Sequence, residues 1–145
     1  MTGKSLTPQE LRIWYAFQLM GEEVLGRVGR DIAEATGLSG SEFGVLSRLA
    51  GTGQGEMRQQ ALAQLMGWEK SRLSHQLTRM QDRGLIRRQS RDGAVLIALT
   101  KFGKEKLGEA LPVRAESVKR HFLSRLSQDQ IDTIVRVSNL LADEE

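Results

Sequence analysis

The sequence predicts a mainly helical α+β protein in which one β-hairpin interrupts a series of amphipathic helices. Apolar residues recur every three or four positions over most of the 145 residues, which is the helical period. Ser/Thr-x-x-Glu/Gln capping boxes occur three times and mark helix starts. Asp92-Gly93 stands between two short β-prone runs, a strong hairpin signal. A chain of this length is expected to form one domain, residues 1–145.

The first predicted helix is long and begins at the capping box formed by Thr7 and Glu10, with Pro8 in the first helical position. Its apolar stripe, which includes Trp14 and Phe17, continues to about Gly37. This terminal helix of about 25 residues is longer than the usual globular helix, and we expect it to serve an oligomer.

A second, short helix is predicted after the capping box of Ser39 and Glu42. The glycine-rich run 51–55 follows it and resembles a phosphate-binding loop. No strand precedes this run, however, and it lacks the Gly-Lys-Ser/Thr ending of a P-loop. We interpret it as a flexible loop.

Two further helices are predicted at 58–66 and 69–83, separated only by Gly67-Trp68, in the pattern of a helix-turn-helix motif. In the second of them, Leu73, Leu77 and Met80 form the buried stripe. Strands are predicted at 85–89 and 94–99, joined by a turn at 90–93. A hairpin directly after a helix-turn-helix is the order of a winged helix.

The remaining chain is predicted to be helical again from Thr100. Pro112 is expected to interrupt or kink this helix, because proline lacks the backbone donor that a helix interior needs. The capping box of Ser127 and Gln130 then opens the last helix.

Composition excludes several classes of function. The chain has no cysteine and only two histidines, so we predict no metal site, no cofactor and no thiol chemistry. No nucleophile–histidine–carboxylate set is apparent, and an enzyme is the weakest interpretation. The longest apolar run, 94–99, is far too short to cross a bilayer, and no secretory signal is visible. We therefore expect a cytoplasmic protein without a membrane partner.

Positive charge is concentrated in the middle of the chain. The whole sequence has a net charge of only +3, yet the window 56–93 carries eight basic and four acidic residues, and the rest is net negative. The predicted helix 69–83 presents donors opposite its apolar stripe, and arginine, histidine, serine and glutamine are residue types that contact base edges and phosphates. The alternative is an ordinary solvated face. The predicted DNA-binding residues are Lys70, Ser71, Arg72, Ser74, His75, Gln76 and Arg79 of this helix, with Arg88 and Arg91 of the hairpin.

Five residues have two interpretations each. Arg87 and Arg88 are neighbours on a strand and point to opposite faces, so we expect only one to face DNA. Trp68 is either a packing anchor, which we favour, or a phosphate contact through its indole N–H. Trp14 and Phe17 belong either to helix or dimer packing, which we favour, or to the lining of an aromatic-ligand pocket.

The order of these pieces resembles the MarR (multiple antibiotic resistance regulator) family of winged helix-turn-helix regulators. The most specific stretch runs from Gly67-Trp68 through Ser71-Arg72-Leu73-Ser74-His75-Gln76 to Arg87-Arg88, and Leu99-Thr100…Gly103 also matches. The resemblance implies a homodimer that binds a pseudo-palindromic double-stranded DNA operator, often as a repressor relieved by a small aromatic or phenolic ligand. It assigns 39–99 to DNA binding, and 7–37 and 100–142 to helical dimerisation parts.

The hairpin departs from the family pattern. The family usually carries Asp-x-Arg shortly before the Leu-Thr pair, whereas here Arg91 stands in place of the aspartate and Gly93 in place of the arginine. We expect Arg91 to substitute for the missing arginine, with a weaker contact to DNA. Two alternatives to a sequence-specific regulator stay open, namely a constitutive, non-specific DNA-binding protein without an effector, and a winged helix used as a protein-interaction module.

Overall fold

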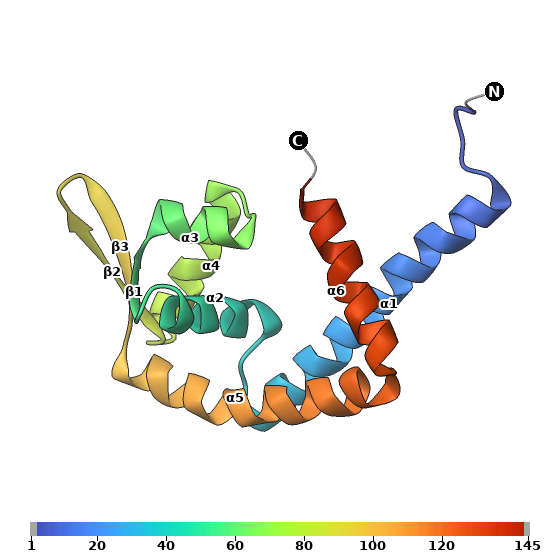
Figure 1. The fold of residues 1–145 in the computed structure, drawn as a ribbon. Helices are drawn as coiled ribbons and strands as arrows, with labels where there is room; N and C mark the ends of the chain where they lie inside the picture. The colour runs from blue at the N-terminus through green and yellow to red at the C-terminus, as the bar shows by residue number, and fades with distance from the viewer. Residues whose placement is uncertain (1–2, 144–145) are drawn as a thin grey trace. The chain divides into compact units, whose positions relative to one another are not determined.

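The computed structural model describes residues 3–143 and shows a mainly helical chain with one small sheet (Figure 1). The predicted fold class, a winged helix flanked by helices, is confirmed. The elements in chain order are α1 (Pro8–Thr36), α2 (Gly40–Gly51), β1 (Glu56–Arg58), α3 (Gln59–Met66), α4 (Lys70–Asp82), β2 (Ile86–Arg91), β3 (Ala94–Leu99), α5 (Lys101–His121), the 3-10 turn η1 (Leu123–Arg125) and α6 (Gln128–Ala142).

The described residues form two compact units, and the divisions between them fall inside helices. One unit comprises residues 30–114 and contains the winged helix; the other comprises the described residues before and after it. The C-terminal end of α1 and the first part of α5 therefore belong to the same unit as the winged helix. The predicted functional parts have other limits, at 37–39 between α1 and α2 and at 99–100 between β3 and α5.

The three predicted capping boxes are confirmed, each with both of its reciprocal hydrogen bonds. At the start of α1, the Thr7 backbone N–H donates to the Glu10 carboxylate, and the Glu10 N–H donates to the Thr7 hydroxyl. Hydrogen bonds to the Glu10 carboxylate from the Thr7 backbone and from the Thr7 side chain lower the pKa of Glu10. The contribution of this carboxylate to the cap is thus present above the usual carboxyl range and is lost as the pH falls through the lowered pKa.

The sheet has three strands, one more than the sequence predicts. Its order is β1-β3-β2, with both pairs antiparallel, and Met57 of β1 lies opposite Ile97 of β3. β1 has only three residues, too few to show strand periodicity, and the helical pattern predicted from 58 includes its last residue, Arg58. Pairing with the distant β3 is what makes this segment extended.

The hairpin turn is tighter than predicted. β2 continues to Arg91, which pairs with Ala94, so the turn consists of Asp92 and Gly93 alone rather than 90–93. Both turn residues have positive φ, 53° and 77°, as a type I′ turn requires. Glycine adopts this conformation without strain and aspartate tolerates it.

Pro112 does not interrupt α5, which is continuous from Lys101 to His121. The helix loses one backbone hydrogen bond at this position, but the turns on both sides continue. A break occurs later instead, at Phe122 and η1, before the capping box of α6.

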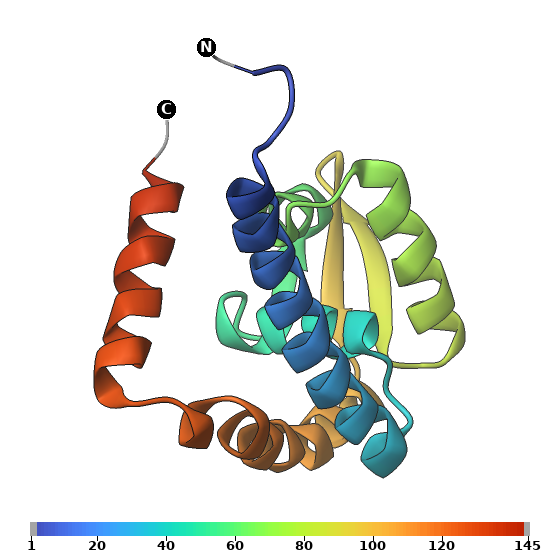
Figure 2. The same cartoon turned by 90° about the vertical axis from the view of Figure 1, so that its right-hand side faces the viewer.

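The core of the winged-helix unit lies between the helices and the sheet. α4 runs beside β2 in Figure 2, and its stripe of Leu73, Leu77 and Met80 is completely buried, as predicted. The other fully buried apolar side chains of this core include Leu38, Val45, Leu46, Leu49, Leu62, Leu85, Ile86 and Ile97.

Polar contacts connect the segment between α1 and α2 to α4 and α5. Arg83, at the C-cap of α4, donates to both oxygens of the Glu42 carboxylate, which also accepts the Ser39 N–H. The Lys106 ammonium of α5 donates to the Thr36 carbonyl at 3.0 Å. The end of α4 is therefore tied to the start of α2.

Candidate nucleic-acid interface

The outward face of α4 carries most of the residues predicted to contact DNA. Because Leu73, Leu77 and Met80 face the core, the opposite side of the helix is directed to solvent. Exposed residues on it are Lys70, Ser71, Arg72, His75 and Arg79, and Ser74 is half-buried. The structure thus brings these six side chains together on the N-terminal two-thirds of one helix.

Arg72 stacks on Trp68. Its guanidinium carbon lies 3.9 Å from the centroid of the Trp68 ring, within the range of a cation–π contact. Trp68 is half-buried, so it is less deeply packed than the favoured interpretation as a core anchor expects. Its exposed ring surface supports an arginine instead.

Gln76 differs from the other predicted residues because it is only 7% exposed. Its side-chain oxygen accepts a hydrogen bond of 2.6 Å from the Arg79 guanidinium. A side chain so buried does not lie on the DNA-facing surface. Its visible role is to hold Arg79.

The two neighbouring arginines of β2 have different surroundings. Arg88 is half-buried and donates to the Gln81 and Thr78 side chains of α4, at 2.8 and 2.9 Å. Arg87 is exposed. Arg88 therefore ties the hairpin to α4, with part of its donor capacity already used.

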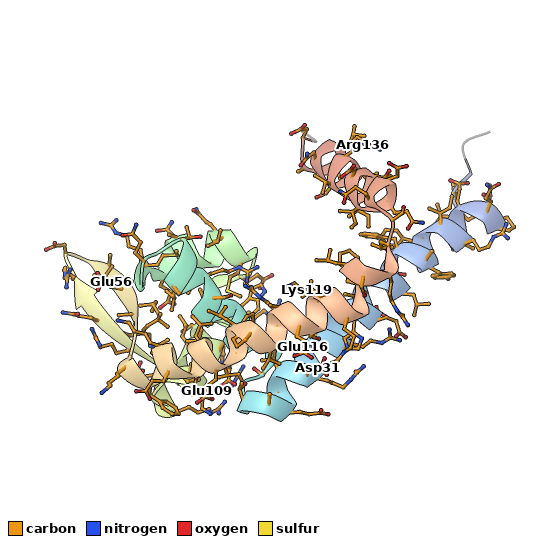
Figure 3. All side chains as sticks on the ribbon, turned by 60° about the horizontal axis from the view of Figure 1, so that its bottom comes forward. Asp31, Glu56, Glu109, Glu116, Lys119 and Arg136 are labelled. Atoms are coloured by element: carbon orange, nitrogen blue, oxygen red, sulfur yellow. The ribbon has the colours of Figure 1, made fainter. Side chains whose placement is uncertain are left out.

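Arg91 lies at the end of β2, next to the turn, and forms a long ion pair across the sheet. Its guanidinium is 3.9 Å from the carboxylate of Glu56 on β1, and both side chains are about half exposed. Figure 3 shows Glu56 at the sheet, near the hairpin. Glu56 is thus the acidic residue that pairs with Arg91 in this shortened hairpin.

A groove of about 780 Å³ lies between the first turns of α3 and α4 and the hairpin tip. Two cations line it, Arg58 and Lys70, together with one carboxylate, Asp92, and the hydroxyls of Ser71 and Ser74. Neither α3 nor α4 has a side-chain hydrogen bond at its N-cap, unlike α2 and α6. The partial positive charge of two helix N-termini therefore adds to that of the two cations.

Arg58 also lines this groove, although the sequence does not predict it as a site residue. The sequence includes it in the basic window but predicts it to lie inside a helix. Its actual position, at the end of β1 and the N-cap of α3, depends on pairing between β1 and β3. The local excess of positive charge was the only signal in the sequence that included it.

The remaining sequence predictions concern the aromatic pair of α1, metal binding and membrane spans. Trp14 and Phe17 of α1 are about half exposed, with ring centroids 6.0 Å apart. Among residues 3–143, no group of three or more histidine, cysteine or acidic side chains could hold a metal ion. No helix in the same range is long and apolar enough to cross a membrane.

Several solved structures are similar to this chain over nearly its whole length. AbsC, a MarR family transcriptional regulator from Streptomyces coelicolor, is 27% identical; the match covers 97% of each chain with a TM-score of 0.87. Sco3205, a MarR family transcriptional regulator from the same organism solved in complex with DNA, is 23% identical; the match covers 97% of this chain and 91% of that one, with a TM-score of 0.88. A MarR mutant from E. coli complexed with operator DNA shares only 13% identity, with coverage of 95% and 99% and a TM-score of 0.82.

At the level of sequence, no curated protein matches this chain. The family model described as MarR family matches residues 24–94, a range that includes the whole helix-turn-helix and the hairpin turn. The family match and the whole-chain likeness to AbsC agree with the arrangement of α3, α4 and the hairpin. The central part of this chain, residues 24–94, therefore matches the MarR family, and the whole chain is similar in structure to the MarR family transcriptional regulator AbsC.

Proposed function

We propose that the protein is a sequence-specific, double-stranded DNA-binding transcription regulator rather than an enzyme. The observation that carries the proposal is the exposed donor face of α4 beside a cationic groove at the hairpin. A recognition helix reads base edges in the major groove with its N-terminal residues, and those are the residues exposed here.

The residues divide into two roles. Three residues on the outermost face of α4 are proposed to contact bases, namely Arg72, His75 and Ser71. Lys70, Ser74 and Arg58 line the groove beside the helix N-termini, where a phosphate of the DNA backbone would be stabilised. Arg79 is proposed to contact DNA with the donors that Gln76 leaves free. On the hairpin, Arg91 and the remaining donors of Arg88 are proposed to contact the adjacent minor groove or its phosphates.

The first test is a mobility-shift assay on the DNA flanking the protein's own gene, with a salt series. We expect Arg72→Ala to reduce affinity for this duplex by about 1–3 kcal/mol and to relax sequence specificity. Arg91→Ala should weaken binding to all duplexes similarly and lower the salt slope by about one. Arg12→Ala, which removes an exposed arginine of α1, is the control of equal charge and should bind like the wild type.

Three outcomes would contradict this assignment. If Arg72→Ala and Arg91→Ala leave both affinity and salt slope unchanged, α4 and the hairpin are not the DNA interface. Equal affinity of the wild type for the natural and a scrambled duplex would favour the alternative of a non-specific DNA-binding protein. No binding at about 50 mM salt, where phosphate contacts are strong, would favour a protein-interaction module.

We further propose that the protein is a homodimer that uses the apolar faces of α1 and α6. Exposed apolar side chains on these helices include Ile13, Trp14 and Phe17 of α1 and Val137, Leu140 and Leu141 of α6. Exposed apolar surface of this extent is typical of a protein interface. A homodimer would also present two α4 helices to the two halves of a pseudo-palindromic operator.

Leu140→Glu is expected to shift the protein from dimer to monomer in analytical ultracentrifugation. Leu140 is 74% exposed in the single chain, so the substitution should leave the monomer folded, while a charge buried at a dimer interface is strongly unfavourable. The control is Ser138→Glu, which adds the same charge to another exposed position of α6 and should stay dimeric. A dimer of unchanged stability in Leu140→Glu would exclude this face of α6 from the interface.

The family resemblance adds one expectation, namely that the protein is a repressor and that a small aromatic or phenolic ligand relieves the repression. A ligand relieves repression only if it binds the free protein more tightly than the DNA-bound form. Of the two interpretations of Trp14 and Phe17, their exposure favours dimer packing. A reporter controlled by the flanking DNA tests the sign of regulation, because deletion of the regulator should raise expression.

A further inference from the structure

We propose that Trp68 is a positioning residue for sequence reading, which holds the Arg72 guanidinium ready for a base edge. The inference rests on the proposed function, because it assigns a specific role within the same interface. Neither of the interpretations that the sequence suggested for Trp68, core packing or phosphate contact, includes this role. Three observations carry it, namely the fixed backbone of Trp68, the stacking geometry, and the free donors of Arg72.

The backbone of Trp68 is fixed by the turn between α3 and α4. Gly67 has a left-handed conformation, with φ of 66°, and ends α3. The Trp68 N–H then donates to the Ala63 carbonyl at 3.1 Å, as in a Schellman-type helix end. The indole is therefore attached to a hydrogen-bonded turn and not to a loose loop, and it is half-buried.

The stacking orients Arg72 without using its hydrogen-bond donors. Arg72 lies four residues after Trp68, in the first turn of α4, with its guanidinium carbon 3.9 Å from the ring centroid. A guanidinium that lies on an aromatic face keeps its N–H groups directed along its edges. Within residues 3–143, no hydrogen bond or ion pair of these N–H groups is found, so they are available to a guanine O6 and N7.

The two other arginines close to this face are held in a different way. Arg79 donates to Gln76, and Arg88 donates to Gln81 and Thr78. Part of their donor capacity is thus occupied within the protein. Arg72 combines restricted motion with unoccupied donors, so it loses less conformational entropy than a free arginine when it binds a base.

The test is a double-mutant cycle on Trp68 and Arg72 in the full-length protein. The DNA is a duplex selected by the wild type from a random-sequence library, compared with a scrambled duplex of the same length. We expect Trp68→Leu to lower affinity for the selected duplex about five- to tenfold and to leave affinity for the scrambled duplex unchanged, since an ordered arginine side chain is worth roughly that factor. Trp68→Phe, which retains an aromatic face, should recover part of the loss.

In the Arg72→Ala background, Trp68→Leu should have no further effect, because the residue that it positions is absent. Leu65→Ala is the control, since Leu65 is an exposed apolar residue on the neighbouring α3 and should bind DNA like the wild type. Thermal unfolding of each variant confirms that it is folded. A second measurement needs no DNA, since the Arg72 Nε–H signal in NMR relaxation should report faster motion in Trp68→Leu than in the wild type.

The outcomes separate this inference from the proposed function. Additive losses in the cycle, or equal losses on the selected and scrambled duplexes, would overturn the positioning role while leaving a DNA-binding regulator in place. Unchanged mobility of Arg72 in Trp68→Leu would overturn it as well. If the wild type selects no duplex, the proposed function itself fails, and the role in reading fails with it even where the NMR result shows that Trp68 restrains Arg72.

Discussion

Gly103→Ala is expected to destabilise the protein by about 3 kcal/mol or more, because this substitution overpacks a site where backbone contacts backbone. Gly103 is buried in the first turn of α5. A Cβ atom there would lie 2.0 Å from the Leu85 carbonyl oxygen and 3.1 Å from the Leu85 carbonyl carbon. No side-chain rotation relieves such a clash, so α5 would have to move away from the segment that joins α4 to β2.

The measurement is urea unfolding, followed by circular dichroism. Gly108→Ala is the matched control, since Gly108 lies in the same helix with nothing within 4 Å of the added Cβ. There, replacing a helical glycine should stabilise the protein by about 0.5–1 kcal/mol. Equal stability of Gly103→Ala and the wild type would contradict the close packing of α5 on Leu85.

Arg83→Met is the second substitution with a large expected effect, about 3 kcal/mol of lost stability, because it leaves a buried carboxylate without its cation. The Glu42 side chain is only 7% exposed, whereas that of Arg83 is 46% exposed. The two partners of this ion pair therefore differ in burial. Glu42→Gln should cost less, because the freed Arg83 is solvated by water and glutamine still accepts the Ser39 N–H, as Gln130 does in the capping box of α6.

The control for Arg83→Met is an exposed ion pair of the same type. Arg27 and Glu23 of α1 pair at 3.0 Å, with side chains 37% and 49% exposed. Arg27→Met is expected to cost no more than about 0.5 kcal/mol, as for exposed i,i+4 pairs. If Glu42→Gln proves more destabilising than Arg83→Met in urea unfolding, the burial of Glu42 is not what sets the cost.

The features that could be predicted from the sequence are those determined by residues close together in the chain. A capping box needs a serine or threonine and a carboxylate or amide three positions later, so the starts of α1, α2 and α6 were predicted correctly. The stripe of Leu73, Leu77 and Met80 defines the buried face of α4 by its spacing alone. The opposite, donor-bearing face follows from it, and most of its predicted residues are exposed.

Two residues differ in the structure from what their local sequence predicts. Pro112 satisfies the local criterion for a helix break, yet α5 continues through it. Gln76 is polar and lies next to the predicted donor face, yet it is buried beneath Arg79. At Pro112 the helix continues with one backbone hydrogen bond fewer, and at Gln76 the hydrogen bond from Arg79 satisfies a side-chain oxygen that is otherwise buried.

By itself, the sequence determined the order of the helices, their caps, the hairpin and the position of the charged window, because each depends on contacts within a few residues. Only the tertiary structure decided that 56–58 is a strand, that Arg58 joins Lys70 in one groove, and that Glu56 pairs with Arg91. These contacts join residues that lie 12 to 42 positions apart in the chain. Their free energy is gained only after the chain between them has been ordered, and no local pattern records it.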